Sequence, residues 1–236
     1  VLKSDCLDLP EKVYTKRSVS LTPEQLKAYT EMKKAAITFF EENVMTAASV
    51  LTQMIRLHQI ICGHVKTDDG EIKSIKSNRI KELLEVLEET DGKVIIWAVY
   101  RYDIQQIEKT LGEKYGKESV ATYYGDTKDN IRQSIVDRFM DPDDPLQFFV
   151  GNPKTGGYGL TLTSSHTVVY YSNDYSLEVR LQSEDRAHRI GQNNKVTYVD
   201  LMADHTIDEK IVKSLNAKID LASQVMGEDP KKILFG

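Results

Sequence analysis

Two arginines in the last quarter of the chain have the type and spacing of an anion receptor. Residues 182–192 read QSEDRAHRIGQ. If this stretch is helical, Gln182, Arg186 and Arg189 share one face, because they lie four and three residues apart. Two guanidiniums on one face form a fork that suits phosphate oxygens. We expect Gly191 to end this helix. The alternative interpretation is a solvated face with ordinary ion pairs.

A glycine-rich stretch offers a second way to hold phosphate. Residues 151–163 read GNPKTGGYGLTLT, so that Gly156, Gly157 and Gly159 closely follow Lys154. Glycines let backbone amides approach an anion and form a nest around it. The stretch is not a Walker A loop, because a Gly-Tyr pair stands where that motif requires Lys-Ser/Thr. An ordinary tight turn is the alternative.

The sequence offers no pair of acids after a predicted strand that could hold Mg²⁺. Asp208-Glu209 falls at the start of a predicted helix, and Glu184-Asp185 falls within the arginine segment. A magnesium-nucleotide site usually takes its carboxylates from the end of a buried strand. We therefore expect these four acids to cap helices or to lie on the surface.

His58, Cys62 and His64 combine side chains that can bind zinc. His58 and Cys62 fall on the apolar side of a predicted helix, and no fourth ligand is evident in the sequence. A structural zinc site is closed by four ligands, so we do not expect one here. The sequence also lacks the glycine-flanked serine elbow of the hydrolases.

The composition is that of an ordinary globular protein. The 236 residues are 40% hydrophobic and 28% charged, with a formal net charge of -5. This balance argues against a surface that is basic throughout, although a local groove can still bind nucleic acid. Two cysteines are too few for a disulfide framework, which indicates a reducing compartment. We expect a cytoplasmic or nuclear protein that is not secreted. Because the sequence begins with Val1, we also expect a fragment of a longer chain.

Strands and helices alternate from residue 77 onward. Residues 93–99 (KVIIWAV) form an almost continuous apolar run, which is typical of a strand buried on both faces. The alternation predicts an α/β fold, with a parallel sheet and helices on both of its faces. Ligands bind at the carboxyl ends of such strands. We expect the glycine stretch and the arginine helix at this edge, together with the 124–127 loop, whose Thr127 should cap a helix. The predicted strands are 93–99, 119–124, 146–150, 167–171 and 196–202.

Two shorter regions flank the predicted sheet, which we assign to residues 66–205. Residues 1–65 hold an extended segment and two helices, the first beginning at a capping box of Thr22 and Gln25. Residues 206–236 hold a tail and a long helix that opens with a second capping box, Thr206 to Glu209. The second N-terminal helix should end at Gly63, with an apolar side made of Val50, Leu51, Met54, Ile55, His58 and Ile61.

Taken in order, these motifs resemble those of a known family. DRAHRIGQ, residues 185–192, resembles motif VI of the Swi/Snf-type DNA-dependent ATPases in helicase superfamily two. GGYGLTL, residues 156–162, resembles motif V, and KVIIWAV is similar to motif IV. The likeness extends over essentially the whole chain and implies a RecA-like C-terminal lobe with a small N-terminal helical insertion and a C-terminal bracing helix. Further matching stretches are LPEK (9–12), LTPEQL (21–26), LTQM (51–54) and TIDEKI (206–211).

The resemblance also implies residue roles. In this family the motif VI arginines meet the γ-phosphate of ATP, which the first lobe holds with Mg²⁺. Arg189 would be the arginine finger and Arg186 its partner, while Gln182 would orient the pair or link it to the DNA side. Gly157, Gly159 and Asp185 would lie on the nucleotide side. The residues implied to meet the DNA backbone are Gly125, Thr127, Lys154, Gly156 and Thr161.

The activity implied is that of an ATP hydrolase that moves along double-stranded DNA. Its partner would be an N-terminal RecA-like lobe, and without Walker motifs the chain alone is not expected to hydrolyse ATP. Two alternatives stay open: a non-catalytic nucleic-acid-binding module and the lobe of an RNA helicase. Asn152-Pro153 replaces a Ser/Thr pair usual in the family, and Tyr175 stands where Trp is common. The first departure removes the hydroxyls that the family uses for polar contacts before motif V.

Overall fold

One parallel sheet organises the chain. The computed structural model describes residues 9–42, 46–67, 69–155 and 159–226. Six strands lie in the order β1-β8-β7-β4-β6-β5, and each neighbouring pair is parallel. The predicted α/β fold is confirmed. The strands are β1 (Lys12–Ser18), β4 (Lys93–Trp97), β5 (Val120–Tyr123), β6 (Phe148–Gly151), β7 (Ser165–Tyr170) and β8 (Val196–Met202).

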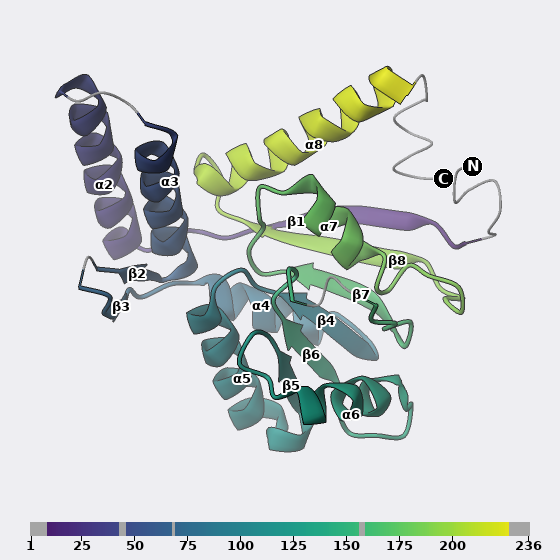
Figure 1. The fold of residues 1–236 in the computed structure, drawn as a ribbon. Coiled ribbons are helices and arrows are strands. Elements are labelled where there is room, and N and C mark those ends of the chain that lie inside the picture. The colour runs from purple at the N-terminus through teal and green to yellow at the C-terminus, as the bar shows by residue number, and fades with distance from the viewer. Residues whose placement is uncertain (1–8, 43–45, 68, 156–158, 227–236) are drawn as a thin grey trace.

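Helices cover both faces of this sheet, as Figure 1 shows. On β4, Val94 and Ile96 belong to a core cluster with α4 (Arg79–Glu88) and α5 (Arg101–Tyr115). Ile95 and Trp97 belong to a second cluster with α6 (Asp129–Met140). All four side chains are fully buried, which confirms the prediction that this apolar run is covered on both faces. A short helix, η1 (Lys117–Ser119), precedes β5.

The extended N-terminal segment forms the sixth strand. β1 lies at the edge of the sheet and pairs in parallel with β8, from Lys12 opposite Val196 to Ser18 opposite Met202. The sequence indicated an extended segment here without assigning it to the sheet. This pairing places residues from the start of the chain beside the segment that follows the arginines.

Two helices, α2 (Pro23–Glu42) and α3 (Ala47–Cys62), stand side by side at one end of the sheet (Figure 1). The capping box that opens α2 is confirmed: the Gln25 amide accepts from the Thr22 N–H and Thr22 Oγ1 accepts from the Gln25 N–H, both at 3.2 Å. Gly63 ends α3 in the left-handed conformation, with φ 99°, as predicted. A hairpin of β2 (His64–Lys66) and β3 (Ile72–Ser74) follows.

The predicted apolar side of α3 is covered only in part. Leu51 and Ile55 are 53% and 41% exposed, which corrects the expectation that they are inward-facing. The covered residues lie near the C-terminal end of α3, where Leu57 and Ile61 pack against α8 (Ile207–Met226). The remainder of α3 extends beyond the sheet beside α2 (Figure 1).

The helix α8 opens differently from the predicted box. Thr206 Oγ1 accepts from the Asp208 N–H at 3.2 Å, and Glu209 Oε2 accepts from the His205 N–H at 3.0 Å, so the acid caps the residue before Thr206. Whether α8 braces two lobes stays a prediction, as do the three domain boundaries, and residues 227–236 lie outside the described residues. Among the described helices, none is both long and apolar enough to span a membrane.

Candidate functional site

The helix that leads to the arginines ends earlier than the spacing suggested. α7 runs from Leu177 to Glu184, and Asp185 to Gly191 form turns and a bend. The carbonyl of Glu184 still accepts from the His188 N–H at 3.1 Å and also from Tyr198, but the carbonyl of Arg186 accepts from the Leu162 N–H at 2.9 Å in place of a helical donor. The prediction of one helix through Arg189 is therefore wrong, because α7 ends at Glu184 and a tertiary hydrogen bond takes the carbonyl of Arg186.

The turns nevertheless bring the two arginines together. Nη1 of Arg186 and Nη1 of Arg189 each donate to the carbonyl of Leu160, at 3.4 Å. Arg189 also donates to Thr161 Oγ1 at 3.3 Å. Arg186 is buried and Arg189 is exposed. One guanidinium is thus fixed within the lobe while the other reaches its surface.

The guanidiniums of Arg186 and Arg189 repel one another electrostatically. Burial lowers the pKa of Arg186, and the charge of Arg189 lowers it further, whereas Asp185 opposes the effect. An arginine stays protonated under all ordinary conditions, so the two positive charges remain next to each other. An anion placed between them would relieve this repulsion, and the geometry therefore favours an anionic ligand.

Gln182 does not join this pair. Its side-chain amide donates to Glu178 Oε1 at 2.9 Å, one turn earlier on α7. Asp185 follows the last helical residue, and its N–H donates back to Leu181 O at 3.1 Å. The expectation that Gln182 shares a face with the arginines fails because the helix ends between them.

The glycine stretch crosses the sheet from one edge to the other. At its start, beyond the carboxyl end of β6, Lys154 forms an ion pair with Asp174 at 2.8 Å. At its end, Thr163 and Ser165 accept hydrogen bonds from Gln192 Nε2 at the amino end of β7. The arginines contact this later part, so the prediction that Lys154 and the arginines share the carboxyl edge is wrong. The loop instead connects Lys154, at the carboxyl edge of the sheet, to the part of the chain that the arginines contact.

Of the glycines in this loop, Gly156 and Gly157 lie outside the described residues. Gly159 is exposed, with φ 80°, and a Cβ there would meet no atom within 4 Å. This left-handed conformation favours glycine. The open space around it would admit a ligand close to the backbone.

The loop after β5 is organised around Thr127. The Thr127 hydroxyl accepts from the Tyr124 N–H at 3.0 Å and donates to the carbonyl of Thr122 at 3.1 Å. Its own N–H donates to Tyr124 O at 2.9 Å. The predicted cap of α6 is wrong, because Thr127 closes this turn and Lys128 precedes the helix with no side-chain cap. Gly125 lies exposed at the tip of the turn.

Comparison with known proteins identifies the family. The model of the helicase conserved C-terminal domain matches residues 75–191, about half of the chain. ATP-dependent helicase fft2 of Schizosaccharomyces pombe is 30% identical over 196 residues, 82% of this chain and 15% of that protein. The SWI/SNF chromatin-remodeling complex subunit snf22 of the same species is 28% identical over 238 residues, 93% of this chain and 14% of that protein. The chain is a C-terminal lobe of the Swi/Snf helicase type.

A solved structure has the same fold. The SWI2/SNF2 ATPase core of Sulfolobus solfataricus in complex with dsDNA matches with a TM-score of 0.71 and 24% identity, over 89% of this lobe and 45% of that chain. The RecA-like fold implied by the sequence motifs is therefore confirmed. The lobe spans about a seventh of the length of the two yeast relatives.

A buried ionic network holds the end of α7, and the sequence did not reveal it. Arg180 Nε donates to Glu184 Oε1 at 2.8 Å, and Arg180 Nη1 donates to Asp200 Oδ1 at 2.6 Å. Although burial alone would lower it, the pKa of Arg180 is raised by Asp200 and further by Glu184. Glu184 is 2% exposed, which corrects the expectation of a capping or surface acid. The i,i+4 spacing of Arg180 and Glu184 was the available signal, but spacing does not reveal burial.

A second buried network joins the helical pair to the lobe. The fully buried Arg79 donates to Asp208, to Tyr171 O at 2.6 Å and to Leu201 O at 3.1 Å. His58 Nε2 lies 3.3 Å from Asp208 Oδ1. Asp208 was expected to cap a helix or lie on the surface, and its burial against Arg79 corrects this.

The candidate zinc residues belong to the same region. Cys62 is buried, and burial raises the pKa of its thiol well above the usual value. His64 Nδ1 lies 3.0 Å from Asp103 Oδ1. Across the part of the chain that the structure describes, no group of three or more His, Cys, Asp or Glu side chains could hold a metal ion.

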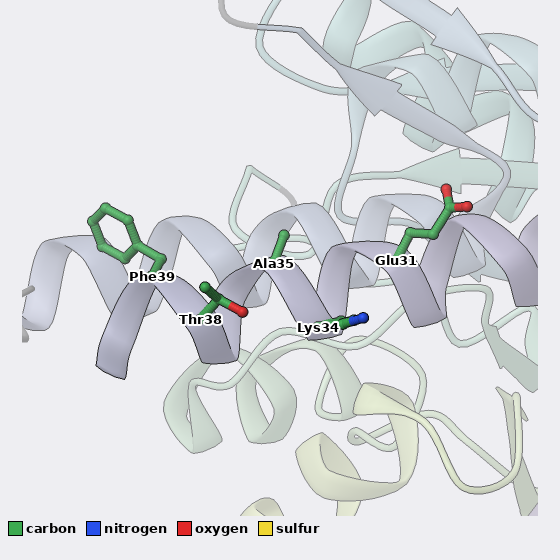
Figure 2. A pocket seen from close by; sticks show the side chains of 5 residues that line it. All are labelled: Glu31, Lys34, Ala35, Thr38 and Phe39. Carbon is green, nitrogen blue, oxygen red and sulfur yellow. The ribbon is translucent and has the colours of Figure 1, made fainter. Parts of the chain in front are cut away.

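A hollow of about 480 Å³ lies on the outer surface of α2 (Figure 2). All of its lining residues come from this one helix, which projects beside α3 and away from α7 (Figure 1). It therefore forms no part of the arginine site. The lining residues are Glu31, Lys34, Ala35, Thr38 and Phe39.

Proposed function

We propose that this lobe is the second motor lobe of an ATP-dependent translocase on double-stranded DNA. Its partner is an N-terminal RecA-like lobe that holds ATP and Mg²⁺. The observation that carries the proposal is the convergence of Arg186 and Arg189 on the Leu160 carbonyl. This arrangement presents two positive charges beside a glycine loop, as a phosphate held by another lobe requires.

Arg189 is the arginine finger in this proposal and Arg186 supports it. Phosphoryl transfer develops negative charge on the transferred group, and a finger arginine is worth about 10³ to 10⁵ in rate. Exposure of Arg189 fits a residue that reaches a ligand on another lobe, whereas burial of Arg186 fits a fixed supporting charge. Gln182 is left out of the pair, since Glu178 holds its amide.

Of a nucleotide's parts, only the phosphates match features of this lobe. The arginines match an anion, and Gly159 leaves space for one. Glu184, the last residue of α7, and Asp208, in the first turn of α8, are instead buried against Arg180 and Arg79. Mg²⁺ is therefore assigned to the first lobe.

The DNA side of the proposal lies at the carboxyl edge of the sheet. Lys154 is 60% exposed and Gly125 is at a loop tip, where both can meet phosphate oxygens. Thr161 accepts from Arg189 at the other end of the same loop, so motif V connects the two sites. Thr127 supports its own turn, since its hydroxyl and N–H are both used there. Duplex DNA as the ligand is supported by the dsDNA complex of the Sulfolobus relative.

The test is ATP turnover by the two-lobe protein with duplex DNA present. Arg189→Ala should lower kcat by about 10³-fold or more, because it removes charge stabilisation at the transferred phosphate. Arg17→Ala is the matched control. Arg17 is an arginine paired with Glu82 and Glu89 beside α4, and its removal should leave kcat unchanged.

Unchanged turnover in Arg189→Ala would reject the finger assignment. The same assay with duplex RNA distinguishes the alternative of an RNA helicase lobe, which stimulation by RNA in place of DNA would favour. Binding of DNA without any stimulated turnover in the unsubstituted two-lobe protein would favour a non-catalytic binding module.

A further inference from the structure

The start of the chain contacts the arginine segment directly. The carbonyl of Pro10 lies 2.6 Å from His188 Nε2. Glu184 Oε2 accepts from Tyr14 Oη at 2.7 Å and from Lys12 Nζ at 3.2 Å. Residues 10–14 thus contact Glu184 and His188, which lie two residues before and two residues after Arg186. Figure 1 shows β1 beside β8 with α7 lying across them.

These contacts have defined donors and acceptors. A carbonyl oxygen only accepts, so His188 Nε2 carries the proton and donates to Pro10. Burial raises the pKa of Tyr14, and the charge of Glu184 raises it further, so its hydroxyl stays protonated and donates. His188 and Glu184 are 4% and 2% exposed. Hydrogen bonds to a buried charged group are among the stronger ones in proteins.

The neighbouring strand β8 adds further contacts to Glu184 and Tyr14. The rings of Tyr14 and Tyr198 stack with centroids 5.2 Å apart. Tyr198 Oη donates to the backbone carbonyl of Glu184 at 3.0 Å, and Arg180 ties the carboxylate of Glu184 to Asp200. Glu184 is thereby fixed from β1, β8 and α7, and it lies two residues before Arg186.

We propose that Tyr14, Glu184 and His188 are positioning residues for Arg186 and Arg189, and that residues 10–14 set where these arginines stand. The inference rests on the proposed function. The arginines lie beyond the end of α7, where a few turn hydrogen bonds remain but the regular helical pattern stops, so their place also depends on these tertiary contacts. A displacement of residues 10–14 would move the arginines without breaking the central strands.

The test compares two tyrosines in the two-lobe protein. Tyr14→Phe removes the hydroxyl bonded to Glu184 and keeps the ring. Tyr100→Phe is the matched control, because that half-buried hydroxyl bonds His58 at 2.9 Å in the other network. Tyr14→Phe should lower the kcat of DNA-stimulated hydrolysis by about three- to tenfold, with KM for ATP within about twofold, since misplaced catalytic groups chiefly reduce kcat. Tyr100→Phe should leave both constants unchanged.

A second pair of variants tests the other contact. His188→Ala removes the donor to Pro10 and should lower kcat by up to about a hundredfold. His188→Gln retains an N–H donor at a similar reach and should restore much of the loss. Rescue by this conservative change separates positioning from a general loss of packing.

Arg189→Ala in the same panel separates the two proposals. If it abolishes turnover while Tyr14→Phe and His188→Ala keep the wild-type kcat, the positioning role is wrong and the proposed function stands. Equal losses in Tyr14→Phe and Tyr100→Phe would also overturn the positioning role, because they would reflect stability alone. Wild-type turnover in Arg189→Ala would reject the proposed function and this inference with it.

Discussion

Asp208 lies in the first turn of α8 with its carboxylate buried between Arg79 and His58. Burial alone would raise its pKa, but Arg79 and then His58 lower it to about 2. A buried carboxylate that stays ionised in this way ties α8, α4 and α3 to one point. Its charge therefore contributes to the stability of the lobe.

The pKa of Asp208 predicts how the lobe responds to acid. Because the folded pKa is below that of the unfolded chain, the ionised group stabilises the fold above about pH 4. That contribution, about 2 kcal/mol, is lost as the pH falls toward 2. Urea unfolding at pH 7 and pH 3 should show Asp208→Asn to be less stable at pH 7, by about 3 to 5 kcal/mol, because Arg79 is left unpaired. The difference from wild type should shrink at pH 3.

Asp129→Asn is the control for this measurement. Asp129 also stands at the start of a helix, but its side chain is 93% exposed. Its removal should change the stability little at either pH. A loss in Asp208→Asn no larger than in Asp129→Asn would contradict the role given to the buried pair.

At the scale of elements, the strands could be predicted because their signal is local. The run from Val94 to Trp97 is apolar at every position, and burial on both faces requires such a pattern. β1 carries no such run, since its edge position leaves Val13 37% exposed. Its place in the sheet depends on β8, at the far end of the sequence, and no pattern within β1 indicates that partner.

In the arginine segment, the sequence predicted that two residues lie together but not the backbone conformation that brings them together. The spacing of Arg186 and Arg189 fits a helix, and the inference that they act together from one place agrees with their shared contact at Leu160. The helix itself ends at Glu184, and the carbonyl of Arg186 accepts from the Leu162 N–H instead of continuing it. The sequence thus indicated that the two arginines lie together, whereas the backbone that presents them was decided by distant parts of the chain.

The end of α3 gives a prediction at this scale. Gly63 has φ 99°, and a Cβ there would lie 2.8 Å from the Cβ of Ser77 and 3.2 Å from the carbonyl of Ile75. Gly63→Ala should therefore lower the free energy of unfolding by about 2 to 4 kcal/mol, combining left-handed strain with overpacking. Thermal or urea unfolding measures the loss.

Gly92→Ala separates the two causes. Gly92 has φ 79°, but its added Cβ would meet His166 Nε2 only at 3.8 Å, an ordinary contact. Strain alone should cost about 1 to 2 kcal/mol there. Equal losses at both positions would show that the contact with Ser77 adds nothing.

At the scale of the whole molecule, one loop links the two candidate ligand sites. Within residues 152–164, Lys154 near the start pairs with Asp174, and Thr163 near the end accepts from Gln192. The arginines meet the later part of this loop, and the proposed DNA contact lies at its start. A parallel sheet allows this arrangement because each crossover must pass from the carboxyl edge back to the amino edge.

This arrangement predicts how DNA binding by the two-lobe protein depends on salt. The lobe has a net charge of -5, so attraction to DNA must come from local cations such as Lys154. Lys154→Ala should weaken duplex binding regardless of sequence and reduce the slope of log K against log salt by about 1, because one phosphate contact is lost. Lys195→Ala is matched in exposure, 69% against 60%, and in having one acidic partner. Lys195 lies at the amino edge, so its removal should leave the slope unchanged, and equal slopes for the two variants would remove Lys154 from the DNA interface.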